Sequence, residues 1–192
     1  MRNGIMTEIL FATGNQRKIN EANDTLENYD LSVKTVSIEI DEIQHHDPAE
    51  ITKAKARAAF ALLNKPVVVS DTSWSIPALG GFPGGYMKDV GIWWSEQDWL
   101  NIMASHEDKS IICQEHLAYC DGESLVHFLQ DYKGTFLCSV QGPVINEKAT
   151  IERVVTLDGR SSLAEGQANR ILKGEKKQLE HWQKFGEWLK SK

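Results

Sequence analysis

The sequence of 192 residues has no apolar run long enough to span a membrane. Its first residues lack the long apolar stretch and the small-residue cleavage site of a signal peptide. Cysteine is scarce, and Cys113, Cys120 and Cys138 form an odd set at no metal-like spacing. These features favour a cytoplasmic protein with reduced core thiols and no membrane partner.

An excess of basic charge is also missing, because the formal net charge is −6. A nucleic-acid polymer is therefore not the expected partner, since such a partner calls for a basic surface. A small anionic ligand is compatible with this charge if a local cluster of lysines, together with a metal ion, overcomes the repulsive average field.

What is present is the composition of a soluble globular protein, with 41% apolar and 25% charged residues. The length suits a single domain over residues 1–192 with a sizeable core, and no repeat, low-complexity tract or linker divides it. Apolar periodicity predicts a mixed α/β fold. The expected elements are strands at 8–13, 32–40 and 66–71, helices at 15–26, from 48 onward and at 175–189, and a hairpin at 110–130 that turns at Asp121-Gly122.

The middle helix has a clear start, with Asp47 as N-cap, Pro48 in the first position and Glu50 completing a capping-box pattern. Its expected apolar face consists of Ile51, Ala54, Ala58 and Leu62. The expected apolar face of the last helix consists of Leu179, Trp182, Phe185 and Leu189.

The stretch "TGNQRK" joins the first strand to the first helix. Backbone N–H groups at a helix N-terminus favour anions, and Lys18 in the first turn adds a full positive charge. Thr13 and Asn15 can donate side-chain hydrogen bonds to the same anion. The alternative is an ordinary strand–turn–helix corner in which Asn15 only caps the helix. Both interpretations stay open from this stretch alone.

Four further positions carry acids or cations at places where ligands gather. Asp71 follows the apolar strand "PVVVS", and ligands of α/β sheets collect at the carboxyl ends of strands. It suits a metal ligand or a general base, or else it caps the next turn. Lys55 lies at the edge of the apolar helix face, where it either reaches water or points into a cleft. Asp41 and Glu42 offer carboxylates after the second strand.

Five segments resemble, in order and spacing, the inosine triphosphate pyrophosphatase family: "FATGNQRKINE", "DEIQ", "ITKAKA", "VVVSDTS" and "ALGGFPGGYMK". The match covers roughly the first half of the chain. The resemblance implies hydrolysis of a non-canonical nucleoside triphosphate, such as ITP or XTP, to the monophosphate and pyrophosphate with Mg²⁺. It also implies an elongated mixed α/β sheet flanked by helices, two lobes with a central substrate cleft, and a homodimer.

Site roles follow from the same resemblance. Asp71 and Lys18 are the expected catalytic residues, and Glu42 and Asp71 are the expected metal ligands. The expected substrate-binding residues are Thr13, Gly14, Asn15, Lys18, Lys55, Ser70, Thr72, Gly85 and Lys88. The loop glycines permit positive φ and close backbone approach, and they are Gly80, Gly81, Gly84 and Gly85.

Three departures from the family pattern bear on chemistry and base choice. Ser70 stands where relatives carry an acid before the catalytic aspartate, and Glu39, Asp41 or a phosphate oxygen could compensate. The aromatic "F-G-W/Y-D-P" loop is replaced by "TFLCSVQGPVINEK", and the "S-H-R" motif is missing near "EGQANRILKGEKK". Arg170 and Lys173 could supply a cation there, although solvated surface charge is the preferred interpretation.

Base recognition is therefore open. Trp74, Trp93 and Trp94 could stack on a base, but core or interface packing is the preferred interpretation for each of them. His45 and His46 read as a surface loop and not as metal ligands, because adjacent side chains point apart. The alternatives to the expected activity are a pyrophosphatase with another base preference and a catalytically impaired relative that binds nucleotides as a sensor or partner module.

Overall fold

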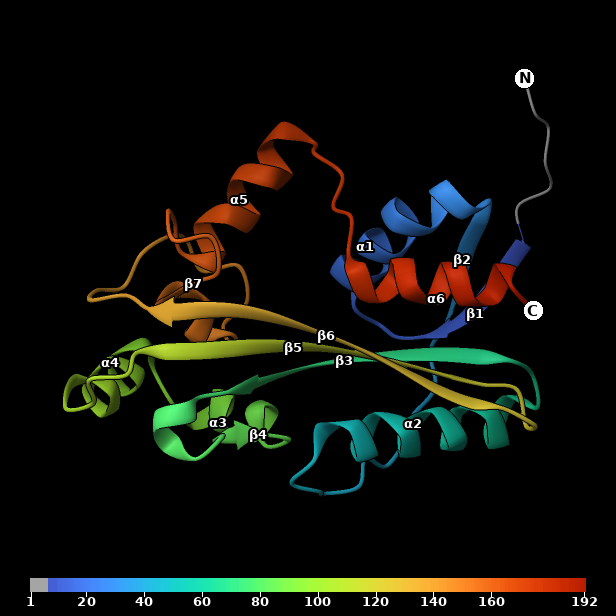
Figure 1. Cartoon of the computed structure of the whole chain (residues 1–192), viewed down its shortest axis with the longest axis horizontal. Helices are drawn as coiled ribbons and strands as arrows, with labels where there is room; N and C mark the ends of the chain where they lie inside the picture. Colours follow the sequence, from blue (N-terminus) through green and yellow to red (C-terminus); the bar gives the residue numbers. More distant parts are fainter. Residues whose placement is uncertain (1–6) are drawn as a thin grey trace. The chain divides into compact units, whose positions relative to one another are not determined.

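The computed structural model describes residues 7–192, and Figure 1 shows their helices and strands. These residues form two compact units, and the chain passes between them four times. The first unit contains 7–72, Glu115–Gln130 and Lys176–Lys192, and the second contains Ser73–Gln114 and Asp131–Glu175. The predicted α/β class, a mixed sheet flanked by helices, is confirmed. The prediction of one domain over the whole chain stays a prediction.

The first unit is built from β1 (Thr7–Ala12), α1 (Gln16–Leu26), β2 (Leu31–Val36), α2 (Pro48–Leu63) and α6 (Glu180–Lys190). Three longer strands contribute to both units, namely β3 (Val67–Ser75), β5 (Ser110–Cys120) and β6 (Leu125–Phe136). The second unit adds β4 (Pro83–Gly84), α3 (Met87–Trp93), α4 (Glu96–Ala104), β7 (Val155–Thr156) and α5 (Leu163–Lys173). The strand order is β2-β1-β3-β5-β6-β7, with β4 beside β3.

In the first unit, α1 and α6 cover one face of the strands and α2 covers the other (Figure 1). Phe11 of β1 packs edge-on against Trp182 of α6, with ring centroids 5.1 Å apart. Ala12 faces the other way and packs with Ala56 and Ala59 of α2. Successive residues of β1 therefore serve opposite layers, as the period-2 geometry of a strand requires.

The second predicted strand is shorter than expected. β2 ends at Val36 and not at Ile40, and 37–46 have no regular structure. Its parallel partner β1 supplies the reason. The last matched pair is Ala12 with Val36, after which β1 turns into α1 and leaves no backbone groups for the ladder to pair with.

The start of α2 is as predicted, with Asp47 accepting the Ala49 N–H and Pro48 in the first turn. The capping box is wrong, because Glu50 pairs with Lys53 at 2.8 Å and the Asp47 N–H donates to His45 Nδ1 instead. The predicted apolar face is also rotated. The buried residues of α2 are Ile51, Thr52, Ala56 and Ala59. Leu62 is exposed and Ala54 and Ala58 are only partly buried, since the sheet lies against the neighbouring stripe of the helix.

β3 continues to Ser75, so Asp71 lies within the strand and not at its end. The parallel β1–β3 pairs are Leu10 with Val67 and Phe11 with Val68, and β1 stops one residue past that register. Asp71 therefore lies beyond the end of its parallel neighbour, in the space that the β1–α1 corner faces. The ligand-binding position predicted for a strand end arises here from the end of β1.

The hairpin between β5 and β6 is confirmed, with a four-residue connection at Asp121–Ser124. The Asp121 carboxylate accepts the N–H groups of Glu123 and Ser124, and Gly122 adopts φ +93°. A side chain at Gly122 would therefore be strained, which explains glycine at this turn.

The last helix, α6, begins at Glu180, later than predicted, because 175–179 are held by α1 in an irregular path. The Lys177 N–H donates to Asp24 and the Leu179 N–H donates to Thr25. Leu179, Trp182 and Phe185 are buried as predicted. Gly186 allows a close approach, since a Cβ there would lie 2.8 Å from the ring of Tyr29.

The second unit has its own core, formed around Trp74, Trp99 and Ile151. α4 and α5 begin with complete capping boxes, Ser95 with Asp98 and Ser162 with Glu165. The prediction of three core thiols is wrong for Cys138, which is exposed on an irregular segment, while Cys113 and Cys120 are buried in β5. No helix within 7–192 has both the length and the apolar character needed to cross a membrane.

Candidate functional site

Lys18 and Asp71 come together in the first unit. Lys18 Nζ donates to the backbone carbonyl of Ser70 at 3.1 Å and lies 4.0 Å from Asp71 Oδ1. The lysine side chain is 14% exposed, whereas Asp71 is 36% exposed. A cation held by the backbone thus lies beside a carboxylate that solvent and ligands can reach. The two predicted catalytic residues are therefore neighbours.

The α1 N-terminus is capped by Asn15, whose Oδ1 accepts the N–H groups of Arg17 and Lys18. Thr13 Oγ1 accepts the Asn15 N–H at 3.1 Å, which completes the corner after β1. Asn15 uses its carbonyl oxygen for the cap, so its amide N–H groups remain the part of the side chain suited to an anion. Gly14, Asn15 and Gln16 are exposed at this corner.

Lys55 and Glu42 form a second pair in the same unit, with Nζ and Oε1 2.5 Å apart. The lysine extends from α2 and the glutamate from the irregular segment after β2. The lysine is 19% exposed and the glutamate 31%. Two further predicted residues thus meet each other as an ion pair.

Thr72 links Asp71 to a residue that sequence reasoning missed. The Thr72 N–H donates to Asp71 Oδ1 at 2.9 Å, and its hydroxyl donates to Glu115 Oε2 at 2.9 Å. Glu115 comes from β5, the neighbour of β3, and is only 8% exposed. The available signal was a lone glutamate within "IICQEHLAYC", a run that otherwise predicts a buried strand.

Burial raises the pKa of the Glu115 carboxyl, while Lys18, Arg17 and Lys177 act to lower it and Glu21 raises it further. Both Arg17 and Lys177 pair with Glu21, at 3.4 Å and 2.8 Å. Cations from α1 and from the segment before α6 therefore surround a buried acid beside the Lys18–Asp71 pair.

Gly85 and Lys88 belong to the second unit, so their place near Asp71 stays a prediction. Lys88 is exposed at the start of α3. Positive φ angles occur at Gly80, Gly81 and Gly84, but not at Gly85. Ser70 is buried in β3 and meets Lys18 through its backbone carbonyl.

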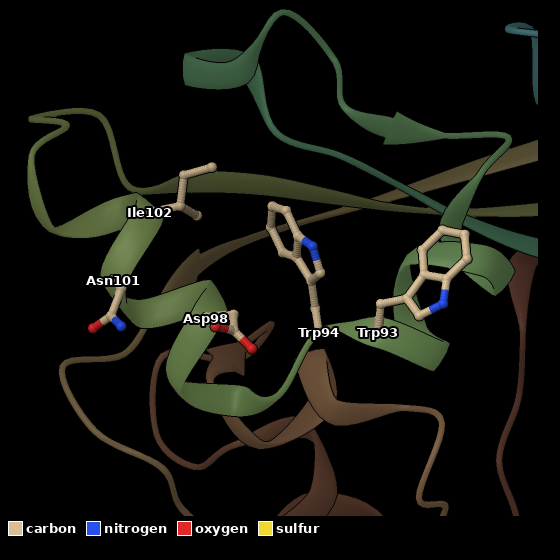
Figure 2. A pocket seen from close by; sticks show the side chains of 5 residues that line it. All are labelled: Trp93, Trp94, Asp98, Asn101 and Ile102. Atoms are coloured by element: carbon tan, nitrogen blue, oxygen red, sulfur yellow. The ribbon is translucent and has the colours of Figure 1, made fainter.

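The three tryptophans considered for base stacking differ in their surroundings. Trp74 is 4% exposed and belongs to the core, so the preferred interpretation, core packing, is confirmed for this residue. Trp94 packs on Trp99 and Phe82. Trp93 is 76% exposed. A pocket of about 620 Å³ is lined by Trp93, Trp94, Asp98, Asn101 and Ile102 (Figure 2), and these do not include any of the expected catalytic, metal-binding or substrate-binding residues.

Metal-binding groups in 7–192 do not gather as three or more His, Cys, Asp or Glu side chains. The described residues therefore do not form a metal site in which protein side chains alone supply three or more ligands. The two predicted metal ligands belong to different ion pairs, Asp71 beside Lys18 and Glu42 beside Lys55, so their role as metal ligands stays a prediction.

Together, the fold and these contacts define an α/β protein with paired lysines and carboxylates where its first parallel strands end. Residues 9–148 match the sequence model of the Ham1 family, and the chain belongs to that family. The inosine triphosphate pyrophosphatase of Yarrowia lipolytica is 35% identical over 135 residues, 67% of this chain and 69% of the relative. The dITP/XTP pyrophosphatase of Methanopyrus kandleri is 32% identical over 128 residues, 66% of this chain and 68% of the relative.

The solved structure of a HAM1 protein from Coxiella burnetii has the same fold. It superimposes with a TM-score of 0.75 at 19% identity, covering 97% of this chain and all of the other. At 19% identity this similarity shows a shared fold only. The similarity in fold extends beyond residue 148, where the match to the family model ends.

Proposed function

We propose that this chain hydrolyses non-canonical nucleoside triphosphates, such as ITP, XTP and their deoxy forms, to the monophosphate and pyrophosphate, and so cleans the nucleotide pool. The observation that carries the proposal is the Lys18–Asp71 pair at the N-terminus of α1. Family membership supports it, because relatives that are 32–35% identical are named for this activity.

The residues of the first unit suit phosphoanhydride hydrolysis. Lys18 and the N-terminal N–H groups of α1 would neutralise the triphosphate and stabilise charge that develops on its oxygens. Lys55 would add a second cation once its pairing with Glu42 is exchanged for a phosphate. Asp71, partly exposed and held by one backbone N–H, would orient a water molecule for attack on a phosphorus.

The proposal includes Mg²⁺, which Asp71 and Glu42 would hold. When bound, the ion supplies positive charge that offsets the charge of the triphosphate. A homodimer and a cytoplasmic location belong to the same proposal, supported by the family resemblance and by the composition. Gly85 and Lys88 are proposed to contact the substrate from the second unit.

The deciding experiment measures pyrophosphate release with Mg²⁺ from ITP, XTP, dITP, dUTP and the four standard triphosphates. We expect turnover to be highest for a deaminated purine. Asp71→Asn should lower kcat by at least about 100-fold while leaving the fold and much of the nucleotide binding intact, because it removes the carboxylate charge but keeps the shape.

Asp30→Asn is the matched control. Asp30 is an exposed residue at φ +53°, a conformation that asparagine tolerates well, so this variant should keep wild-type rates. Wild-type rates in Asp71→Asn would refute the role of Asp71. No turnover of any triphosphate by the wild-type protein would refute the proposed activity.

A further inference from the structure

Asp71 is held by a chain of contacts that begins in the interior of the sheet. Glu115 Oε2 accepts the Thr72 hydroxyl, and the Thr72 backbone N–H donates to Asp71 Oδ1, each at 2.9 Å. All three residues belong to the first unit, and Lys18 lies at the outer end of the chain of contacts. Thr72 thus donates two hydrogen bonds, one from its hydroxyl to the buried Glu115 and one from its backbone N–H to Asp71.

A carboxyl group at position 115 is costly for the fold. Its side chain is buried and accepts a hydrogen bond from Thr72, and the nearby cations Lys18, Arg17 and Lys177 oppose part of the burial cost. Ile111 and Leu117 on the same strand are fully buried apolar residues, so β5 readily accommodates an apolar side chain. A buried acid at a position where the strand accommodates apolar side chains points to a role at the adjacent site.

We propose that Glu115 is a positioning residue, which fixes Thr72 by accepting its hydroxyl and thereby holds the Asp71 carboxylate in its working orientation. This inference rests on the proposed function for its catalytic consequence. Its structural content, that Glu115 determines where Asp71 points, stands apart from which triphosphate is hydrolysed.

The mechanism requires hydrogen-bond acceptance by residue 115 and not its charge. Glu115→Gln keeps an acceptor oxygen at nearly the same position, whereas Glu115→Met keeps the size and removes the acceptor. Thr72→Val removes the donor with almost no change of shape, and Thr72→Ser restores it. These four variants separate the hydrogen bond from packing at both of its ends.

We expect Glu115→Met and Thr72→Val each to lower kcat about 10- to 100-fold, as loss of a supporting partner commonly does, with KM changed less than about twofold. Glu115→Gln and Thr72→Ser should recover most of that loss. The double variant Glu115→Met/Thr72→Val should be no slower than the worse single variant, because both remove the same contact. Crystal structures of Glu115→Met should show the Asp71 carboxylate turned away from the Thr72 N–H.

Leu117→Val is the matched control, since it disturbs a fully buried residue two positions along β5 and should lower the melting temperature without changing kcat. The inference is overturned if Glu115→Gln is as slow as Glu115→Met, if the two single losses add, or if Asp71 keeps its place in the Glu115→Met crystals. If the wild-type protein turns over no triphosphate, the proposed function fails, and the crystal structures alone decide whether Glu115 positions Asp71.

Discussion

At the scale of single residues, His181 in α6 is buried and held neutral. Burial lowers its pKa to about 3, and the positive charges of Lys18 and Lys177 act in the same direction, with smaller effects from His116 and Lys184. Its Nδ1 atom has no hydrogen-bond partner within 7–192. An unfolded chain would instead take up a proton at this histidine near pH 6.5.

We expect this difference to make stability depend on pH. Below about pH 6.5 the unfolded chain binds a proton that the folded chain refuses, so His181 lowers stability as pH falls, by a slope approaching about 1.4 kcal/mol per pH unit. Urea unfolding of the wild type and of His181→Leu at pH 7 and pH 5.5 should show the smaller loss in the variant.

The exposed His46 provides the control, because His46→Gln should keep the wild-type slope. The raised pKa of Glu115 acts in the opposite direction, since its protonation at low pH favours the folded state. The quantity to compare is therefore the change in unfolding free energy between pH 7 and pH 5.5, in each variant relative to the wild type. Equal slopes in the wild type and in His181→Leu would contradict the assignment.

At the scale of elements, the β1–α1 corner carries two roles that one substitution can separate. Asn15→Ala removes the cap of α1 and should cost about 1 kcal/mol, a decrease of roughly 2–4 °C in Tm for a chain of this size. Asn15→Asp keeps a capping oxygen and should keep Tm. It also places a negative charge where we propose that phosphates bind, so KM for the triphosphate should rise by about tenfold or more.

Ser162→Ala is the control for the loss of a helix cap away from the proposed phosphate site. Ser162 caps α5 in the second unit, so its replacement should lower Tm without affecting KM. Thermal melts and initial-rate kinetics on the three variants provide both readouts. If KM stays at the wild-type value in Asn15→Asp, Asn15 serves only as a cap and the phosphate-binding role of this corner is lost.

Elements with strong local signals could be predicted from the sequence, and elements defined by their neighbours could not. The cap at Asn15, the cap at Asp47 and the apolar run of β3 are local features, and all three were confirmed. The end of β2 depends on where β1 stops. The short helices α3 and α4 lie in a stretch rich in tryptophan, whose apolar residues show no single period.

The candidate site divides in the same way. Lys18, Asp71, Lys55 and Glu42 were predicted from a motif resemblance, and the structure brings them together as two pairs. Glu115 was missed because its role depends on β5 lying beside β3, a pairing between residues 43 positions apart. Core packing, the preferred interpretation for Trp74, is confirmed, because its ring lies in the core of the second unit.

At the scale of the whole molecule, the two units share their longest strands. β3, β5 and β6 each run from one unit into the other without a break. Loss of either unit would therefore leave half-paired strands in the other. We expect scanning calorimetry to show one transition with a calorimetric-to-van't Hoff enthalpy ratio near one. Two resolved transitions would show that the units unfold independently and would contradict the single domain predicted from the sequence.

The unequal burial of the cysteines has a practical consequence. Cys113 and Cys120 are enclosed within β5, whereas Cys138 is open to solvent in the second unit. A maleimide dye added to the native protein would consequently label one known position without mutagenesis. The anisotropy of a dye on Cys138 would report on the rotational tumbling of the protein. With a fluorescent nucleotide analogue as the second fluorophore, resonance energy transfer between the two would report on nucleotide binding and release during turnover.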